Sequence, residues 1–191
     1  MMRMLILAGL MLAAAPSRAA DAGKELLDFK MTAVTTKTTS TITKQDLLGK
    51  VWVADFIFTR CQGPCPFVSA RMRKLQKRLP KEIKLVSFTV DPDFDQAKQL
   101  RAYAKKYRAD PERWMFVTAP NEASMIPLLK DSFGTAFKED AHADCGYTTT
   151  HSSKFALVGP DGRIKGMYVS KEPDEIARLE REALSLLKGG S

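Results

Sequence analysis

Phe56-Ile-Phe-Thr-Arg-Cys-Gln-Gly-Pro-Cys-Pro66 is the stretch that decides the fold, because an apolar run ends there and an amphipathic helical pattern begins. Its two cysteines, Cys61 and Cys65, therefore belong to a strand-to-helix corner. A residue before proline is pushed out of the helical region, so we expect Cys65 at the N-cap and Pro66 in the first helical position. Both sulfurs then lie on a loop, where unpaired helix N–H groups and the helix dipole lower a thiol pKa.

Strands and helices alternate on both sides of this corner. The apolar run 51–59 is typical of a buried central strand, and Val68, Met72, Leu75 and Leu79 recur at helical spacing, so Met72 is a core residue rather than a ligand. Further strands are expected at 83–90, 114–118, 155–158 and 164–168, further helices at 96–107, 121–133 and 173–188, an edge hairpin within 32–43, and a polar loop at 134–153. This order predicts an α/β fold, a thioredoxin-like central sheet with helices on both faces.

The beginning of the chain predicts export. Arg3, the twelve apolar residues 4–15 and the small-x-small sequence Ser17-Arg-Ala19 are typical of a cleaved signal peptide, residues 1–19. The apolar stretch is shorter than the roughly 20 residues of a spanning helix, so a retained membrane anchor is the weaker alternative. The remaining residues, 20–191, have the length and apolar content of a single domain, which we expect to be a periplasmic or otherwise exported monomer.

The chain is basic, with a formal net charge of +8 that falls to +6 when Arg3 and Arg18 leave with residues 1–19. Basic clusters occur in Arg71-Met-Arg-Lys74 and around Arg101 and Lys105, at helical spacings beside apolar positions. They are interpreted as solvated helix faces. Such a surface also steers a protein towards an acidic partner or peripherally to an anionic membrane, whereas nucleic acid is excluded as a partner by export.

Three cysteines are an odd number, which argues against a scaffold of disulfides and for thiols with chemistry. Far downstream, His151 precedes the apolar run 155–158. Two thiolates and an imidazole, from Cys61, Cys65 and His151, make a plausible soft-metal site. Such a set holds Cu(I) with low coordination and Cu(II) with one further ligand, and zinc stays open as an alternative.

The same residues have rival interpretations. In a thiol-disulfide oxidoreductase Cys61 and Cys65 are the catalytic pair, in which Cys61 attacks and Cys65 resolves, but this chemistry gives no reason for His151. In a thiol peroxidase Thr59 would precede the reactive cysteine, yet its spacing to Cys61 is one residue short. A structural disulfide and an ordinary loop histidine are the simplest alternatives.

Other polar residues near the corner and downstream are also open to interpretation. His142 and Cys145 form either an auxiliary ligand pair, a resolving thiol with its neighbour, or an incidental loop pair. Asp91 and Asp95 are expected as turn and N-cap residues. Asp55 is the unusual carboxylate, because a charge inside a buried strand must be paired or lie near the thiols, where it would tune their pKa.

Four segments together resemble the Sco/SenC family over about residues 28–168. They are Thr59-Arg-Cys-Gln-Gly-Pro-Cys-Pro66, Val90-Asp-Pro-Asp-Phe-Asp95, Arg108-Ala-Asp-Pro-Glu-Arg-Trp114 and His151-Ser-Ser-Lys-Phe-Ala-Leu-Val-Gly-Pro-Asp-Gly162. The resemblance implies a thioredoxin-like fold and copper bound by Cys61, Cys65 and His151. It also implies delivery of that copper to a partner, the dinuclear copper site of cytochrome c oxidase or another copper protein.

The chain departs from the family pattern in four ways. Gln62 stands where many relatives have Pro, Gln96-Ala97 stands where many have Thr-Pro, Cys145 is additional, and no clear permanent anchor is present. The missing anchor and Cys145 bear on the partner and on redox behaviour more than on metal binding.

Overall fold

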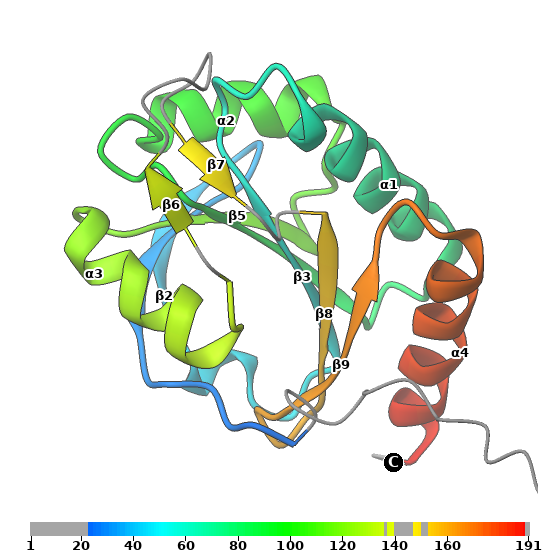
Figure 1. Ribbon diagram of the computed structural model, residues 1–191. Helices are drawn as coiled ribbons and strands as arrows, with labels where there is room; N and C mark the ends of the chain where they lie inside the picture. Colours follow the sequence, from blue (N-terminus) through cyan, green and yellow to red (C-terminus); the bar gives the residue numbers. More distant parts are fainter. Residues whose placement is uncertain (1–22, 136, 140–146, 150–152, 190–191) are drawn as a thin grey trace, which may run out of the picture.

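The computed structural model describes residues 23–135, 137–139, 147–149 and 153–189 of the 191-residue chain. Its main sheet has seven strands in the order β2-β1-β5-β4-β3-β8-β9 (Figure 1). The strands are β1 Lys30–Val34, β2 Thr39–Thr43, β3 Trp52–Ile57, β4 Lys84–Thr89, β5 Trp114–Thr118, β8 Lys154–Val158 and β9 Ile164–Val169. The N-terminal hairpin of β1 and β2 lies at one edge of the sheet, as the sequence predicts.

β3 is an interior strand of the sheet and leads to the cysteines. All six of its residues are buried, which confirms the prediction from its continuous apolar run. β3 pairs in parallel with β4, where Asp55 is opposite Ser87, and antiparallel with β8, where Ala54 is opposite Ala156. The last residues of β3 and the first residues of β8 therefore lie side by side, at the same end of the strands.

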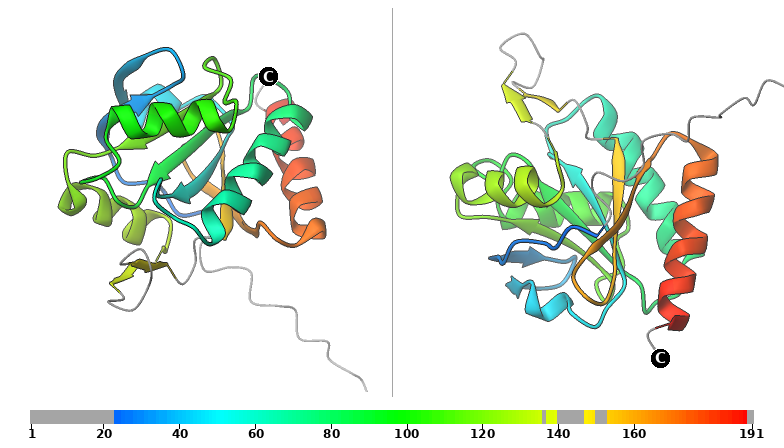
Figure 2. Two further views of the ribbon diagram at one scale, coloured as in Figure 1. Left: turned by 90° about the horizontal axis from the view of Figure 1, so that it is seen from above. Right: turned by 60° about the horizontal axis from the view of Figure 1, so that its bottom comes forward.

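Helices cover both faces of the sheet, which confirms the predicted thioredoxin-like architecture (Figures 1 and 2). The helices α1 Pro64–Arg78, α2 Ala97–Lys106 and α4 Pro173–Gly189 pack their apolar residues into one core. The opposite core is built by α3 Glu122–Pro127, the π-helical turn η2 Leu128–Ser132 and the short 3-10 helix η1 Gln45–Leu47. Val68, Met72, Leu75 and Leu79 lie in the first of these cores, so the helical stripe and the core role of Met72 are confirmed.

Two sequence predictions near these elements are wrong. α1 begins at Pro64 with Gly63 as its N-cap, so Cys65 lies in the first helical turn and not at the N-cap. Either proline can occupy a first-turn position because neither N–H would be bonded there, and the chain uses the earlier one. The expected polar loop 134–153 contains β6 Phe137–Glu139 and β7 Tyr147–Thr149, which pair antiparallel, consistent with their aromatic and β-branched residues.

Pro127 was expected to kink the helix 121–133 or to mark a later start, and it is the last residue of α3, where the helix continues as the π-helical turn η2. The predicted signal peptide, residues 1–19, lies outside the described residues and stays a prediction. Within the part of the chain that the structure describes, no helix combines the length and the apolar character needed to cross a membrane.

Candidate metal centre

The cysteine loop, residues 58–65, connects β3 to the first turn of α1. A backbone hydrogen bond from Cys61 N–H to the Phe58 carbonyl, 3.2 Å, closes a turn at its start. The backbone N–H of Cys65 then donates to Cys61 Sγ over 3.4 Å. The structure thus brings both predicted cysteines together and confirms that a thiol meets an otherwise unbonded N–H at the helix start.

The two thiols have opposite pKa shifts. Hydrogen bonds to Cys61, from the Cys65 thiol and from the backbone N–H groups of Cys65 and Gly63, lower the pKa of Cys61 to about 6, against the opposing effect of its partial burial. The pKa of Cys65 is raised because its proton is held by Cys61 and its side chain is buried. Near neutral pH the pair therefore holds one proton, with Cys61 as thiolate and Cys65 as thiol.

Burial separates the roles of the two sulfurs. Cys65 is 1% exposed and Cys61 is 9% exposed, and neither is in a disulfide. Cys61 is the less buried of the two residues, so we expect an incoming metal or a partner's sulfur to meet it first. The geometry suits an exchanging ligand backed by a buried one.

Asp55 is fully buried in β3, and neither of its carboxylate oxygens has a hydrogen-bond partner of ordinary geometry. Burial raises the pKa of Asp55 to about 7, an effect that the Ser87 hydroxyl opposes only in part. The Ser87 oxygen itself accepts a hydrogen bond from the Trp114 indole, 2.9 Å. The charge of Asp55 in turn contributes to the raised pKa of Cys65, so this carboxylate acts on the buried thiol.

Asp95 has a structural role beside the site that the sequence did not reveal. It was expected to cap the helix after it, but the N-cap of α2 is Gln96 and Asp95 is fully buried. Its carboxylate accepts hydrogen bonds from the Thr59 backbone N–H, 2.9 Å, from the Thr59 hydroxyl and from the Thr89 hydroxyl, 2.6 Å. This Asp95 cluster (Thr59, Thr89 and Asp95) connects the cysteine loop to the end of β4.

A second connection lies beside it at the surface. The Arg60 Nε donates to Asp91 Oδ2 over 3.1 Å, and its guanidinium lies 4.2 Å from the centre of the Phe94 ring. The backbone carbonyl of Asp91 accepts from the N–H groups of Phe94 and Asp95, so the predicted turn role of Asp91 is confirmed. The segment 91–95 is therefore attached to the loop residue that directly precedes Cys61.

The remaining predicted site residues, His151, His142 and Cys145, lie outside the described residues. In the described ranges, no three Cys, His, Asp or Glu side chains are grouped as a metal site. What those ranges do provide is a pair of adjacent soft donors. Two such sulfurs suit Cu(I) or Zn²⁺ and exclude hard-cation chemistry based on oxygen ligands.

The chain is similar to known proteins over most of its length. The SCO1/SenC family model matches residues 21–184. A SCO1 protein homolog of Bacillus subtilis is 37% identical over 130 residues, which are 66% of this chain and 66% of that protein. A putative copper-binding protein of Stutzerimonas stutzeri is 32% identical over 126 residues, 64% of this chain and 59% of that protein. The match thus spans two thirds or less of each of these relatives.

The fold agrees with solved structures of such proteins. BsSco, described as a Sco family member among cytochrome c oxidase assembly proteins and as having a disulfide switch, is similar with a TM-score of 0.70 and 32% identity. That similarity covers 86% of this chain and 95% of the solved chain.

Proposed function

Because the chain belongs to the SCO1/SenC family, we propose that it is a copper metallochaperone that binds copper through Cys61, Cys65 and His151. The observation that carries the proposal is the pair of adjacent cysteines at the start of α1, where the Cys65 backbone N–H donates to Cys61 Sγ. The name of the Stutzerimonas stutzeri relative, a putative copper-binding protein, supports it.

Copper is cargo in this proposal, and the donor chemistry fits a cargo. Thiolates are soft ligands that favour Cu(I), and an imidazole accepts either oxidation state. Cys61 is already deprotonated at neutral pH, so metal binding there displaces no proton, while Cys65 must release one. A site with two to three protein ligands keeps a coordination position open, so it releases its ion to a competing ligand set more readily than a closed four-ligand site.

The topology supports the third ligand. β8 runs antiparallel to β3, so its first residue lies at the sheet edge where β3 enters the cysteine loop. The backbone carbonyl of Ser153 is held there by the N–H of Ser170, 2.7 Å. His151 is two residues before Ser153, a span of at most roughly 7 Å of chain, which suits an imidazole that reaches the two sulfurs.

We further propose that the copper goes to the dinuclear copper site of cytochrome c oxidase, in the periplasm or another exported location. The description of BsSco as one of the cytochrome c oxidase assembly proteins supports this destination. Transfer is tested by mixing the copper-loaded protein with the apo form of the copper-bearing oxidase domain. Copper counted on each protein after separation should move to the oxidase domain.

The binding proposal is tested by copper retention. The reduced chain without residues 1–19 is loaded anaerobically in the presence of a competing Cu(I) chelator, and the copper per protein is counted. We expect one equivalent in the wild type and its loss in Cys61→Ser, Cys65→Ser and His151→Ala. The chain supplies matched controls, since His142→Ala and Cys145→Ser remove its only other histidine and cysteine.

The controls should retain copper as the wild type does. Equal loss in His142→Ala and His151→Ala would assign the histidine role to neither residue in particular. Full retention by His151→Ala would remove it from the site.

A thiol-disulfide oxidoreductase is the second candidate, favoured by the contact between a thiolate and a thiol. The Cys61 thiolate would attack a partner disulfide to give a mixed disulfide, and Cys65 would then attack Cys61 sulfur and release the partner's second thiol. Two thiols of this chain are oxidised and one partner disulfide is reduced. The disulfide switch of BsSco supports the possibility of this cycle. No copper retention together with rapid reduction of a model disulfide would favour it over the chaperone.

A further inference from the structure

α1 and α2 present a uniformly basic outer surface, here called the α1–α2 face. α1 carries five basic residues and α2 four, and neither helix has an acidic one: Arg71, Arg73, Lys74, Lys77 and Arg78, then Lys98, Arg101, Lys105 and Lys106. α4, on the same side of the sheet, mixes acidic and basic residues. A solvated helix face needs no such bias, because interspersed charges of both signs serve solubility as well.

A groove runs between the two helices on this face. Its volume is about 350 Å³, and it is lined by Ala70, Arg73, Lys74, Lys77, Lys106 and Tyr107. The helices are held side by side by hydrogen bonds between the Ser69 and Tyr103 hydroxyls, 2.9 Å, and from Gln76 to the Arg108 carbonyl, 3.2 Å. The groove is therefore lined by four cationic side chains together with Ala70 and Tyr107, and the two helices that form it are fixed relative to each other.

In the described part of the chain, the groove cations have no acidic ion-pair partner. Among the residues that the structure describes, Arg78 pairs with Glu180 at 2.8 Å, but none of the four groove cations is in an ion pair. Arg101 is likewise occupied, because it donates to Thr35 and Thr39. Four like charges around one groove repel one another, so an external anionic group of matching shape would gain free energy by entering it.

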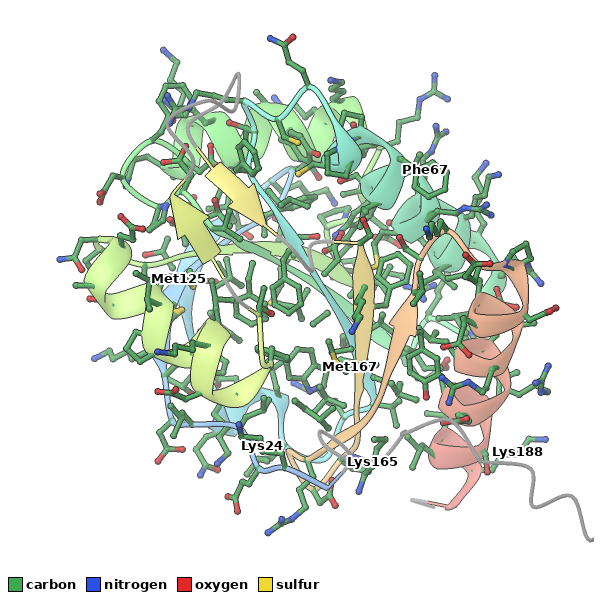
Figure 3. All side chains as sticks on the ribbon, in the orientation of Figure 1. Lys24, Phe67, Met125, Lys165, Met167 and Lys188 are labelled. Carbon is green, nitrogen blue, oxygen red and sulfur yellow. The ribbon has the colours of Figure 1, made fainter. Side chains whose placement is uncertain are left out.

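The groove lies close enough to the cysteines to share one interface with them. Its residues on α1 are five to twelve positions after Cys65, roughly 8 to 18 Å along the helix axis. Between the two lies Phe67, which is 45% exposed on the outer side of α1 (Figure 3), with the Arg71 guanidinium 5.1 Å from its ring centre. A standard interface covers about 800 Å² per partner, roughly 30 Å across, and would include all three features.

We propose that the α1–α2 face docks an acidic surface of the protein with which this chain exchanges copper. The inference rests on the proposed function, since it names the chemistry of the partner in that exchange. Exposed aromatic and arginine side chains are typical anchors of protein interfaces, as Phe67 and Arg71 are here. A lipid surface would need a broad apolar strip, and of the large exposed apolar side chains in the described ranges only Phe67 lies on these two helices.

The test uses a defined probe, a fluorescein-labelled peptide of alternating Glu and Ser, about twelve residues long, whose binding is followed by fluorescence anisotropy. We expect the double variant Arg73→Glu/Lys77→Glu to bind it at least roughly tenfold more weakly than the wild type, and Arg73→Gln/Lys77→Gln to be intermediate. Raising the salt from about 20 to about 200 mM should weaken wild-type binding by a similar factor, because exposed charges are screened.

The matched control is Lys24→Glu/Lys188→Glu, which makes the same change in net charge at the opposite end of the molecule (Figure 3). It should bind the peptide within about twofold of the wild type. Absence of wild-type binding, or equal weakening in both double variants, would overturn the docking face in favour of a net-charge effect. Tighter binding to phosphatidylglycerol vesicles than to the peptide, with the same dependence on Arg73 and Lys77, would overturn it in favour of a membrane contact.

Copper retention is measured on the same variants. Both double variants should retain one equivalent, because their substitutions lie away from the sulfurs. If the wild type itself retains no copper, the proposed function fails whatever the peptide result; if copper is retained but peptide binding is not selective, only the docking face fails.

Discussion

Asp55 and Asp95 are both fully buried next to the cysteine loop, but their carboxylates differ in hydrogen bonding. Asp95 accepts three hydrogen bonds from Thr59 and Thr89, whereas the oxygens of Asp55 have no partner of ordinary geometry. Burial raises the pKa of both, and for Asp55 it does so to about 7. The Asp95 carboxylate therefore holds the loop in place, whereas the buried charge of Asp55 lowers the stability of the fold.

Of the two buried carboxylates, Asp95 serves the structure of the loop, whereas Asp55 acts on the thiol pair. Hydrogen bonds offset much of the free energy that burying a carboxylate costs, and a carboxylate without them keeps that cost in full. Asp55 raises the pKa of Cys65, so its position has a chemical consequence for the thiol pair. Sites with shifted pKa values of this kind commonly cost stability.

Asp95→Ala should have the largest effect on stability. It removes the acceptor of three hydrogen bonds and leaves the Thr59 N–H and two hydroxyls without it, which predicts a loss of about 3 to 5 kcal/mol in the free energy of unfolding. Urea denaturation measures it. The control is Asp93→Ala, an exposed residue two positions earlier, which should change the free energy by less than about 0.5 kcal/mol. Similar losses in the two variants would mean that the Asp95 cluster does not hold the loop.

Asp55→Asn should have the opposite sign. The folded-state pKa of Asp55 lies above its ordinary value of 3.8, so the folded wild type binds the extra proton between about pH 4 and pH 7 and loses stability as the pH rises through that window. The neutral amide avoids the loss, so at pH 8 we expect the variant to be more stable by about 2 to 4 kcal/mol. Urea denaturation at a series of pH values measures the difference.

The advantage of Asp55→Asn should shrink towards pH 4 and stay constant above about pH 7.5. Asp93→Asn, the exposed control, should show no such window. A difference between Asp55→Asn and the wild type that is the same at pH 5 and pH 8 would contradict a raised pKa at this position.

The contrast between the two aspartates also shows how far the sequence could be read. Periodicity and apolar runs depend on neighbours in the chain. The strand β3, the apolar face of α1 and the hairpin of β1 and β2 could therefore be predicted. Asp55 could be singled out because a charge in such a run is conspicuous. Asp95 precedes a helix and so looked like its cap, whereas its partner Thr59 is 36 residues away, a contact that only the tertiary structure reveals.

The cysteine site, too, could be predicted only in part. The strand-to-helix corner followed from local pattern, but the helix start was misplaced because Pro64 and Pro66 both suit a first turn. The opposite pKa shifts of Cys61 and Cys65 depend on a contact between two side chains, which spacing alone does not give. His151 as a ligand rests on the resemblance and on the proposed copper chemistry, and it stays a prediction.

The smallest expected effect is on the thiol pair itself, where the contributions of Cys65 and Asp55 to the pKa values can be separated. Cys65→Ala removes the principal hydrogen bond to Cys61, so the pKa of Cys61 should rise from about 6 towards its ordinary value of 9.0. The alkylation rate of Cys61 by iodoacetamide near pH 6.5 should then fall at least roughly tenfold, because a smaller fraction is thiolate. Cys65→Ser, which retains a donor, should show a smaller fall.

Asp55→Asn should change the pH profile of the pair, since Asp55 contributes to the raised pKa of Cys65, whereas Asp93→Asn should not. If Asp55→Asn leaves both this profile and copper retention unchanged, its carboxylate has no role at the site and only its cost to stability remains.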